Sequence, residues 1–141
     1  MRSLTLLVLL CAAPAMAQEL PAVQLRAGMH LIRAEVASNY ETRGRGLMHR
    51  KALAPNSGML FIFDAPGLQC MWMKNTYIPL SVAFLDEQGT IINIEDMQPQ
   101  TEDSHCAKRP AIYALEMTQG WFGQRGIKPG MKLAGLDKPS K

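Results

Sequence analysis

A succession of short apolar runs, each bounded by turn-forming residues, restricts what this chain can fold into more than any other feature. The clearest run is Met59–Phe63, which follows the turn Pro55–Gly58 and ends at Asp64–Gly67. Five apolar residues between two turns are typical of a buried strand and are too few for a stable helix. The pattern therefore predicts a sheet rather than a bundle of helices.

Similar runs recur along the chain at the spacing expected of short strands. Asp86–Gly89 has the composition of a hairpin turn and joins Ser81–Leu85 to Thr90–Ile94, whose β-branched side chains suit paired strands. Further strands are predicted, two of them within the first segment, at Val23–Ala37, Cys70–Thr76, Ala111–Met117 and Met131–Leu136. About seven or eight short strands indicate a mainly β fold, an antiparallel barrel or a jelly-roll-like sandwich.

One N-terminal helix is predicted within this β fold. Ser38 and Glu41 have the spacing of a capping box, so the helix should begin at Ser38. It should run to about Leu53, with Glu41 and Arg45 paired one helical turn apart. A short second helical turn is predicted at Gln119–Arg125.

Residues 1–17 have the features of a cleavable export signal. Arg2 precedes the apolar stretch Leu4–Ala13, and small residues at Ala15 and Ala17 suit a signal peptidase. Cleavage after Ala17 would leave a single β domain at 18–136 and a flexible tail at 137–141. The apolar stretch is about half the roughly 20 residues that a membrane-spanning helix needs. We therefore expect a periplasmic or secreted protein that does not span a membrane.

Two cysteines, Cys70 and Cys106, lie beyond the predicted signal. In an exported protein an even number of cysteines is interpreted first as a disulfide. This one would close a loop of about 37 residues and stabilise the fold by roughly 3 to 4 kcal/mol. It would also tether Asp96–Arg109, a polar segment expected to form a long surface loop. Two free thiols, or ligands to a soft metal ion, are the alternatives.

Charge and motif content argue against several classes of protein. The chain has 15 Lys and Arg residues against 12 Asp and Glu, a net charge of +3, and Arg2 belongs to the predicted signal. So small a bias does not predict nucleic acid as a partner. The sequence contains no phosphate-binding loop, nucleophile elbow or zinc-protease motif. No cofactor is predicted.

Seven short motifs follow one another in an order that resembles a known family. They are GLMHR at 46–50, GMLF at 58–61, MWMKNT at 71–76, IPL at 78–80, DEQG at 86–89, YALE at 113–116 and GIKPG at 126–130. Over about residues 23–136 the chain resembles the domain-of-unknown-function family 192. The resemblance implies a compact, mostly antiparallel β domain, frequently exported in bacteria, and implies no activity. Ser81 and Met131 stand where family members often carry an aspartate, so no role of those carboxylates is carried over.

The segment Trp72–Thr76 contains the densest mixture of large and polar side chains. Successive side chains of a strand point to opposite faces, so one face would carry Trp72, Lys74 and Thr76, and the other Met71, Met73 and Asn75. With the methionine face in the core, Trp72 would be a stacking platform and Lys74 a contact for a polar or anionic ligand. The structural alternative is that Trp72 fills the core and Lys74 pairs with Glu116.

The sequence thus predicts a non-enzymatic binding or accessory module of the bacterial cell envelope. Its partner would be a small molecule, a glycan or an envelope protein. The candidate ligand-binding residues come from the helix, the 71–76 segment and the 113–116 motif: Arg45, Arg50, Trp72, Lys74, Asn75, Thr76 and Glu116.

Two alternatives from other classes remain open. An enzyme acting on an envelope substrate, such as a hydrolase, would use Glu116 or His105 as its acid or base. A copper-binding protein would use Met71, Met73 and His105, because thioether ligands suit Cu(I) and eight of the ten methionines lie beyond the predicted signal. Against the copper interpretation, methionine is also a common filler of apolar cores.

Overall fold

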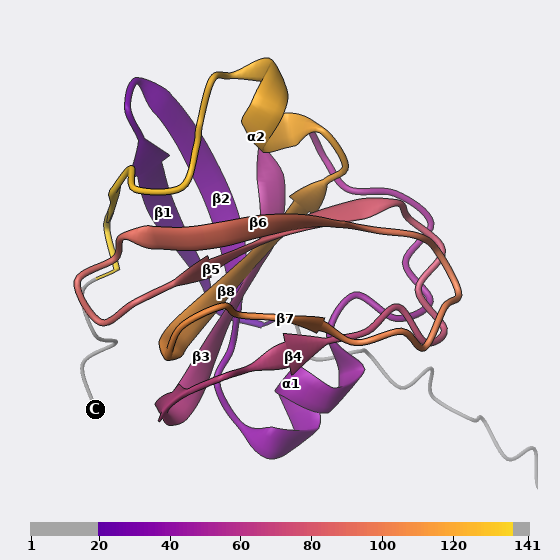
Figure 1. Cartoon of the computed structure of the whole chain (residues 1–141). Coiled ribbons are helices and arrows are strands. Elements are labelled where there is room, and N and C mark those ends of the chain that lie inside the picture. Colours follow the sequence, from indigo (N-terminus) through magenta and orange to yellow (C-terminus); the bar gives the residue numbers. More distant parts are fainter. Residues whose placement is uncertain (1–19, 137–141) are drawn as a thin grey trace, which may run out of the picture.

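The computed structural model of this protein describes residues 20–136 (Figure 1). The predicted signal at 1–17 and the predicted tail at 137–141 lie outside the described residues. Nine strands and two short helices follow one another as β1 (Ala22–Ala27), β2 (His30–Ala37), α1 (Tyr40–Arg45), β3 (Ser57–Gly67), β4 (Cys70–Met71), β5 (Leu80–Leu85), β6 (Ile91–Met97), β7 (His105–Cys106), β8 (Ala111–Thr118), α2 (Trp121–Gln124) and β9 (Leu133–Ala134). Within residues 20–136, no helix is long and apolar enough to cross a membrane.

Seven of the strands form one sheet in the order β6-β5-β8-β3-β2-β1-β9. The mainly β prediction is therefore confirmed, but the prediction of an antiparallel barrel or jelly-roll-like sandwich is not exact, because the sheet is mixed: β2 and β3 are parallel. The connection between them carries α1, and a parallel pair needs such a crossover whereas a hairpin cannot provide it.

The sheet curls into a half-barrel. Its last strand approaches its first at one end, where Thr90 and Lys132 form a bridge and the Ile91 amide donates to the Met131 carbonyl at 2.8 Å. Of the predicted strand Met131–Leu136, only Leu133–Ala134 forms β9. In Figure 1, α2 lies at one end of the curled sheet, and α1 lies with β4 and β7 at the other.

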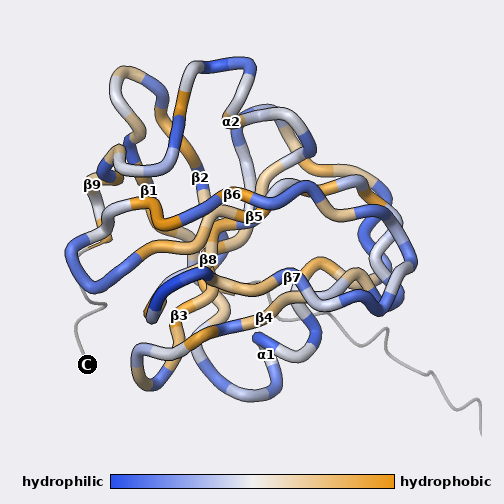
Figure 2. Tube along the Cα trace, in the orientation of Figure 1, coloured by the Kyte–Doolittle hydropathy of each residue, from blue (hydrophilic) through white to orange (hydrophobic). Residues whose placement is uncertain are grey.

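Alternating side chains divide the core between the two faces of the sheet. On β3, Leu60 belongs to one buried cluster, together with Trp121 and Phe122 of α2. Its neighbour Phe61 belongs to a second cluster, which Leu47 and Met73 complete. Figure 2 shows the central strands in the colours of apolar residues and the loops mostly in those of polar ones. Both faces are thus covered, and the second cluster underlies the region described below.

Helix α1 differs from the prediction in position and length. It follows the two strands predicted before it, begins at Tyr40, two residues later than Ser38, and ends at Arg45 instead of about Leu53. Its N-cap is Asn39, whose side chain accepts from the Thr42 amide at 2.8 Å, while the Thr42 hydroxyl oxygen accepts from the Asn39 amide at 3.2 Å. The predicted pair of Glu41 and Arg45 is present at 3.0 Å.

Gly46 ends α1 because its backbone takes φ 49° and ψ −133°, a combination that side chains oppose. A Cβ atom at this position would also lie 3.2 Å from the Phe61 ring. The chain therefore turns away from the helix beside Phe61, which produces one wall of the site described below.

The small second sheet pairs β4 with β7. Cys70 and Cys106 lie directly opposite each other and form the predicted disulfide. The predicted strand 70–76 keeps only its first two residues, and the predicted loop 96–109 contains the end of β6 and all of β7. The buried Asn93 side chain holds β7 in place, since it donates to the Cys106 carbonyl at 3.2 Å and accepts from the Lys108 amide at 3.0 Å.

Candidate functional site

Glu116 is a buried carboxyl group in the middle of the sheet. It lies on β8 between Met59 of β3 and Val82 of β5, on the face that carries the second core cluster. The side chain is 4% exposed, and no residue of the part described by the structure forms a hydrogen bond or ion pair with its carboxyl group. Burial raises the pKa of Glu116 from its ordinary 4.5 to about 8, so the group is a neutral carboxylic acid at pH 7.

A small cavity lies over Glu116. Its volume of about 30 Å³ is large enough for a water molecule or a single polar group of a ligand. The turn at 43–48 forms one wall, and the others come from Phe61, Met71, Trp72 and Thr76. We call this space the Glu116 cavity.

Hydrogen bonds to two neighbouring segments hold the loop 72–76, which forms one wall of this cavity. The Met73 amide donates to the Thr101 carbonyl at 2.9 Å, and the His49 amide donates to the Asn75 carbonyl at 2.9 Å. Thr76 is 5% exposed, and its hydroxyl donates to the Lys74 carbonyl at 3.0 Å. With its proton engaged there, the Thr76 oxygen can only accept a hydrogen bond from a group in the cavity.

A wider groove adjoins the cavity along α1. It has a volume of about 300 Å³ and is lined mainly by Tyr40, Phe61, Phe63, Met71 and Trp72, with Arg43 and Gly44 of the helix. We call it the α1 groove; it shares Phe61, Met71, Trp72 and the 43–44 backbone with the Glu116 cavity. Tyr40 is 91% exposed and Trp72 is 46% exposed, so two accessible aromatic side chains border the groove from different elements.

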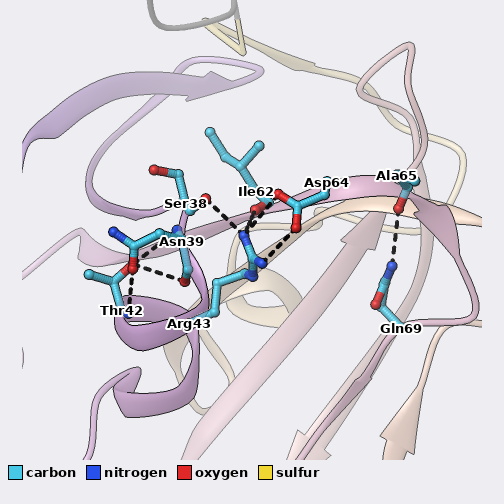
Figure 3. A network of polar contacts seen from close by, with 8 residues as sticks. All are labelled: Ser38, Asn39, Thr42, Arg43, Ile62, Asp64, Ala65 and Gln69. Carbon is cyan, nitrogen blue, oxygen red and sulfur yellow. Dashed lines mark hydrogen bonds and ion pairs between the residues drawn. The ribbon is translucent and has the colours of Figure 1, made fainter.

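Arg43 holds α1 against β3. Its guanidinium group donates to the carbonyl groups of Ser38 and Ile62 at 2.8 and 3.0 Å and pairs with Asp64 at 3.0 Å (Figure 3). The same group lies 5.9 Å from the centre of the Phe63 ring. Arg43 is therefore a structural residue of the groove wall, and its charge is balanced.

The two predicted arginines have different surroundings. Arg45 lines the Glu116 cavity, with its guanidinium group paired to Glu41. Arg50 forms two parallel hydrogen bonds of 2.9 Å with the Glu35 carboxylate, a contact that raises the pKa of the arginine. The structure brings Arg45 to the site and places Arg50 in a separate ion pair.

The predicted alternation along 72–76 is wrong because the segment is a turn. Asn75 takes φ 51°, a left-handed conformation that breaks the strand. Thr76 is buried at the cavity, whereas Lys74 lies 5.2 Å from the centre of the Trp72 ring on the surface. The alternative contacts, Trp72 as core filler and Lys74 paired with Glu116, are also wrong: Trp72 is half-exposed and Lys74 forms no ion pair within residues 20–136.

Two of the three candidate copper ligands are neighbours, and the third lies in the core. Met71 and His105 lie opposite each other on β4 and β7, and Met73 is fully buried in the second core cluster. In the described part of the chain, no three His, Cys, Asp or Glu side chains are grouped as metal ligands would be.

Sequence reasoning missed Tyr40, Arg43, Phe61 and Phe63 as site residues. The sequence did contain a signal for Tyr40. It is a large aromatic residue at the start of the predicted helix, whereas the core-facing positions of that helix were predicted nearer its end. Phe61 and Phe63 gave no such signal, because an apolar strand looks the same whether its side chains meet the core or a groove.

Fold and site together define a class of protein: a curled β half-barrel with an aromatic groove that ends over a neutral carboxyl group. The chain belongs to the DUF192 family, described as "Uncharacterized ACR", whose sequence pattern matches residues 23–135.

Two solved structures share this fold. One, from Sinorhizobium meliloti 1021, is described as a "putative transcription regulator"; it is 37% identical, with a TM-score of 0.76 over 82% of this chain and 92% of that one. The other, from Novosphingobium aromaticivorans DSM 12444, is described as a protein of unknown function; it is 31% identical, with a TM-score of 0.76 over 86% of this chain and 89% of that one. No curated protein matches the sequence.

Proposed function

We propose that this protein is a non-enzymatic binding module of the bacterial cell envelope and that its ligand occupies the α1 groove. The observation that carries the proposal is the Glu116 carboxyl group, which is buried without a hydrogen-bonding partner in the described residues and faces a cavity. The cavity beside it has room for one polar group of a ligand, which would supply a hydrogen-bonding partner.

The predicted signal at 1–17 and the disulfide both support the envelope location. The Cys70–Cys106 disulfide is of the kind that forms in oxidising compartments. The test is to express the full chain in a bacterium and to measure its mass in the periplasmic fraction. Cleavage after Ala17 predicts a protein that begins at Gln18; a full-length protein confined to the cytoplasm would overturn the location.

A hydrolase is the second candidate, because a carboxylic acid with a raised pKa is suited to general acid catalysis. Against it, Glu116 is the one carboxyl group that lines its cavity within the described residues. Glycoside hydrolysis commonly uses two carboxyl groups, and acyl transfer needs a nucleophile beside a base. The Thr76 hydroxyl donates to a carbonyl group and therefore has no base of its own.

Nucleic acid is not favoured by the groove. The name of the Sinorhizobium protein suggests a role in transcription, but around this groove Arg43 and Arg45 are paired with carboxylates. A phosphate backbone would have to displace those partners.

Binding in the groove can be tested by ¹⁹F NMR of the protein labelled with 5-fluorotryptophan. The chain has two tryptophans, Trp72 in the groove and Trp121, which is 5% exposed in the other core cluster. In a screen of small neutral, cationic and anionic ring compounds, the proposal predicts compounds that shift the Trp72 signal and leave Trp121 unchanged. A screen in which no compound does so would overturn it.

A further inference from the structure

The floor of the Glu116 cavity offers a specific set of hydrogen bonds. A protonated carboxyl group has one O–H donor and a carbonyl acceptor, and the Thr76 oxygen adds an acceptor. A hydroxyl group both donates and accepts, so it matches this floor. A volume of about 30 Å³ admits a group of that size and no ring.

Charge around the cavity argues against ionic ligands. The charged side chains that line it besides Glu116 are Arg43 and Arg45, and both are paired with carboxylates. An ammonium group would lose its hydration beside a carboxyl group that is neutral, and the Lys74 cation stands nearby on Trp72. An anion would have to compete with the Asp64 and Glu41 carboxylates for these arginines. A neutral ligand avoids both costs.

The groove above the cavity suits one ring with an apolar face. Tyr40 projects from α1 and Trp72 from the loop after β4, and both border the groove with accessible ring surface. Its volume of about 300 Å³ is at the lower end of the range for small-molecule sites. Aromatic faces of this kind pack against the C–H faces of sugar rings, whose hydroxyl groups remain free to bond elsewhere.

We propose, resting on the proposed function, that the α1 groove binds a neutral pyranose, whose ring packs on Trp72 and Tyr40 and whose C6 hydroxyl group, which projects from the ring, enters the Glu116 cavity. The sugar can be free or the end of a glycan, because the contacts are the same. Glu116 and Thr76 would be its polar contacts, and Arg43 would support the groove wall.

The test uses three compounds that differ in charge at a single carbon: methyl glucopyranoside, its C6 carboxylate and its C6 amine. Each is titrated into the fluorotryptophan-labelled protein. The expected result is a shift of the Trp72 signal with the neutral glycoside and affinities at least about tenfold weaker for the two charged ones. A charged glycoside that binds as tightly as the neutral one, or a neutral glycoside that leaves Trp72 unshifted, would overturn the inference.

Variants separate ligand contact from folding. Glu116→Leu should weaken methyl glucopyranoside binding by at least about tenfold. Because it replaces an unpartnered buried acid with an apolar side chain, it should leave the Trp121 signal and the midpoint of thermal unfolding unchanged or raised. Glu87→Leu, in the exposed hairpin, is the matched control and should bind normally. Equal affinity of the two variants would overturn the role of Glu116.

The outcomes distinguish this inference from the proposed function. If other ring compounds shift Trp72 alone while the neutral glycoside does not, the groove is a binding site and the sugar class is wrong. If no compound of the screen or of this series shifts Trp72 alone, both are wrong.

Discussion

At the scale of single residues, Glu116 couples the fold to the proposed site. Its place on β8 puts it among Met59 and Val82, where an apolar side chain would pack better. A charged form is costly there, so folding selects the protonated carboxyl group. Burial therefore has two effects. It makes Glu116 destabilising at neutral pH, and it keeps the carboxyl group protonated, so that its O–H group can donate a hydrogen bond into the cavity.

This burial predicts how stability depends on pH. Below about pH 4.5 the Glu116 carboxyl is protonated in both the folded and the unfolded state, and between 4.5 and about 8 only the unfolded state releases the proton. The free energy of unfolding therefore falls as pH rises through this range, by on the order of 3 to 5 kcal/mol from this group. Urea unfolding at several pH values measures it.

Glu116→Gln removes the titrating group and keeps the shape of the side chain. The variant should lack this fall, so the difference in unfolding free energy between variant and wild type should grow with pH. Glu87→Gln provides the control for loss of an exposed carboxyl group. Parallel pH curves for wild type and Glu116→Gln would contradict the buried neutral acid.

Arg50 supports a second prediction. Its two hydrogen bonds to Glu35 join the segment after α1 to β2, with the arginine side chain 40% exposed. Arg50→Met should lower the free energy of unfolding by about 1 kcal/mol, a value reduced by solvent screening. Binding to the groove should not change, because Arg50 lines neither space. Weaker ligand binding at unchanged stability would show instead that Arg50 contacts the ligand.

At the scale of elements, the cap of α1 gives a prediction that separates two neighbouring residues. Asn39→Ala should cost about 1 kcal/mol, because the Asn39 side chain bonds the Thr42 amide. Ser38→Ala is the control: Ser38 contributes only its backbone carbonyl, to Arg43. Urea unfolding of both variants measures the difference. Equal losses would contradict the assignment of Asn39 as the N-cap.

The disulfide gives the other prediction at this scale. It joins β4 to β7, and residues 71 and 72 of the groove follow Cys70 directly. The double variant Cys70→Ser/Cys106→Ser should lose roughly 3 to 4 kcal/mol of unfolding free energy, and reductant should produce a similar loss in the wild type. A loss below about 1 kcal/mol would show that Asn93 and the sheet hold this region without the bond.

Several elements could be predicted from the sequence, and the failures have physical reasons. Strand β3 and the β5–β6 hairpin follow from apolar runs and turn residues. The parallel pairing of β2 with β3 was missed because periodicity carries no information on strand direction. The predicted helix between two strands was the available signal, since that order permits a crossover. The turn at 72–76 was missed because Asn75 adopts a left-handed conformation inside an otherwise strand-like segment.

At the scale of the whole molecule, the site is assembled from segments far apart in the chain. Arg45, Trp72, Thr76 and Glu116, proposed from the sequence, all line the Glu116 cavity. Their chemistry could be recognised residue by residue. Which of them are buried could not be predicted from the sequence. Thr76 and Glu116 are buried at the cavity and Trp72 is half-exposed at its rim, because of the way β3, β8 and α1 pack.

The curled sheet explains why one end of the molecule holds the site. At the other end β6 meets the segment before β9 through the Thr90–Lys132 bridge, and α2 packs its two aromatic residues into the core. At the site end the cover consists of a six-residue helix and a two-stranded sheet. Such short elements leave space between them, and the α1 groove is that space.

The most direct test of this account is a pH titration of the Glu116 carboxyl carbon by ¹³C NMR, with the signal assigned by its loss in Glu116→Gln. We expect a midpoint at about pH 8 in the free protein and a higher midpoint with methyl glucopyranoside, because the ligand binds the protonated form. A midpoint near 4.5 would contradict the neutral acid. A midpoint near 8 that the glycoside leaves unchanged would contradict its role as the ligand's partner.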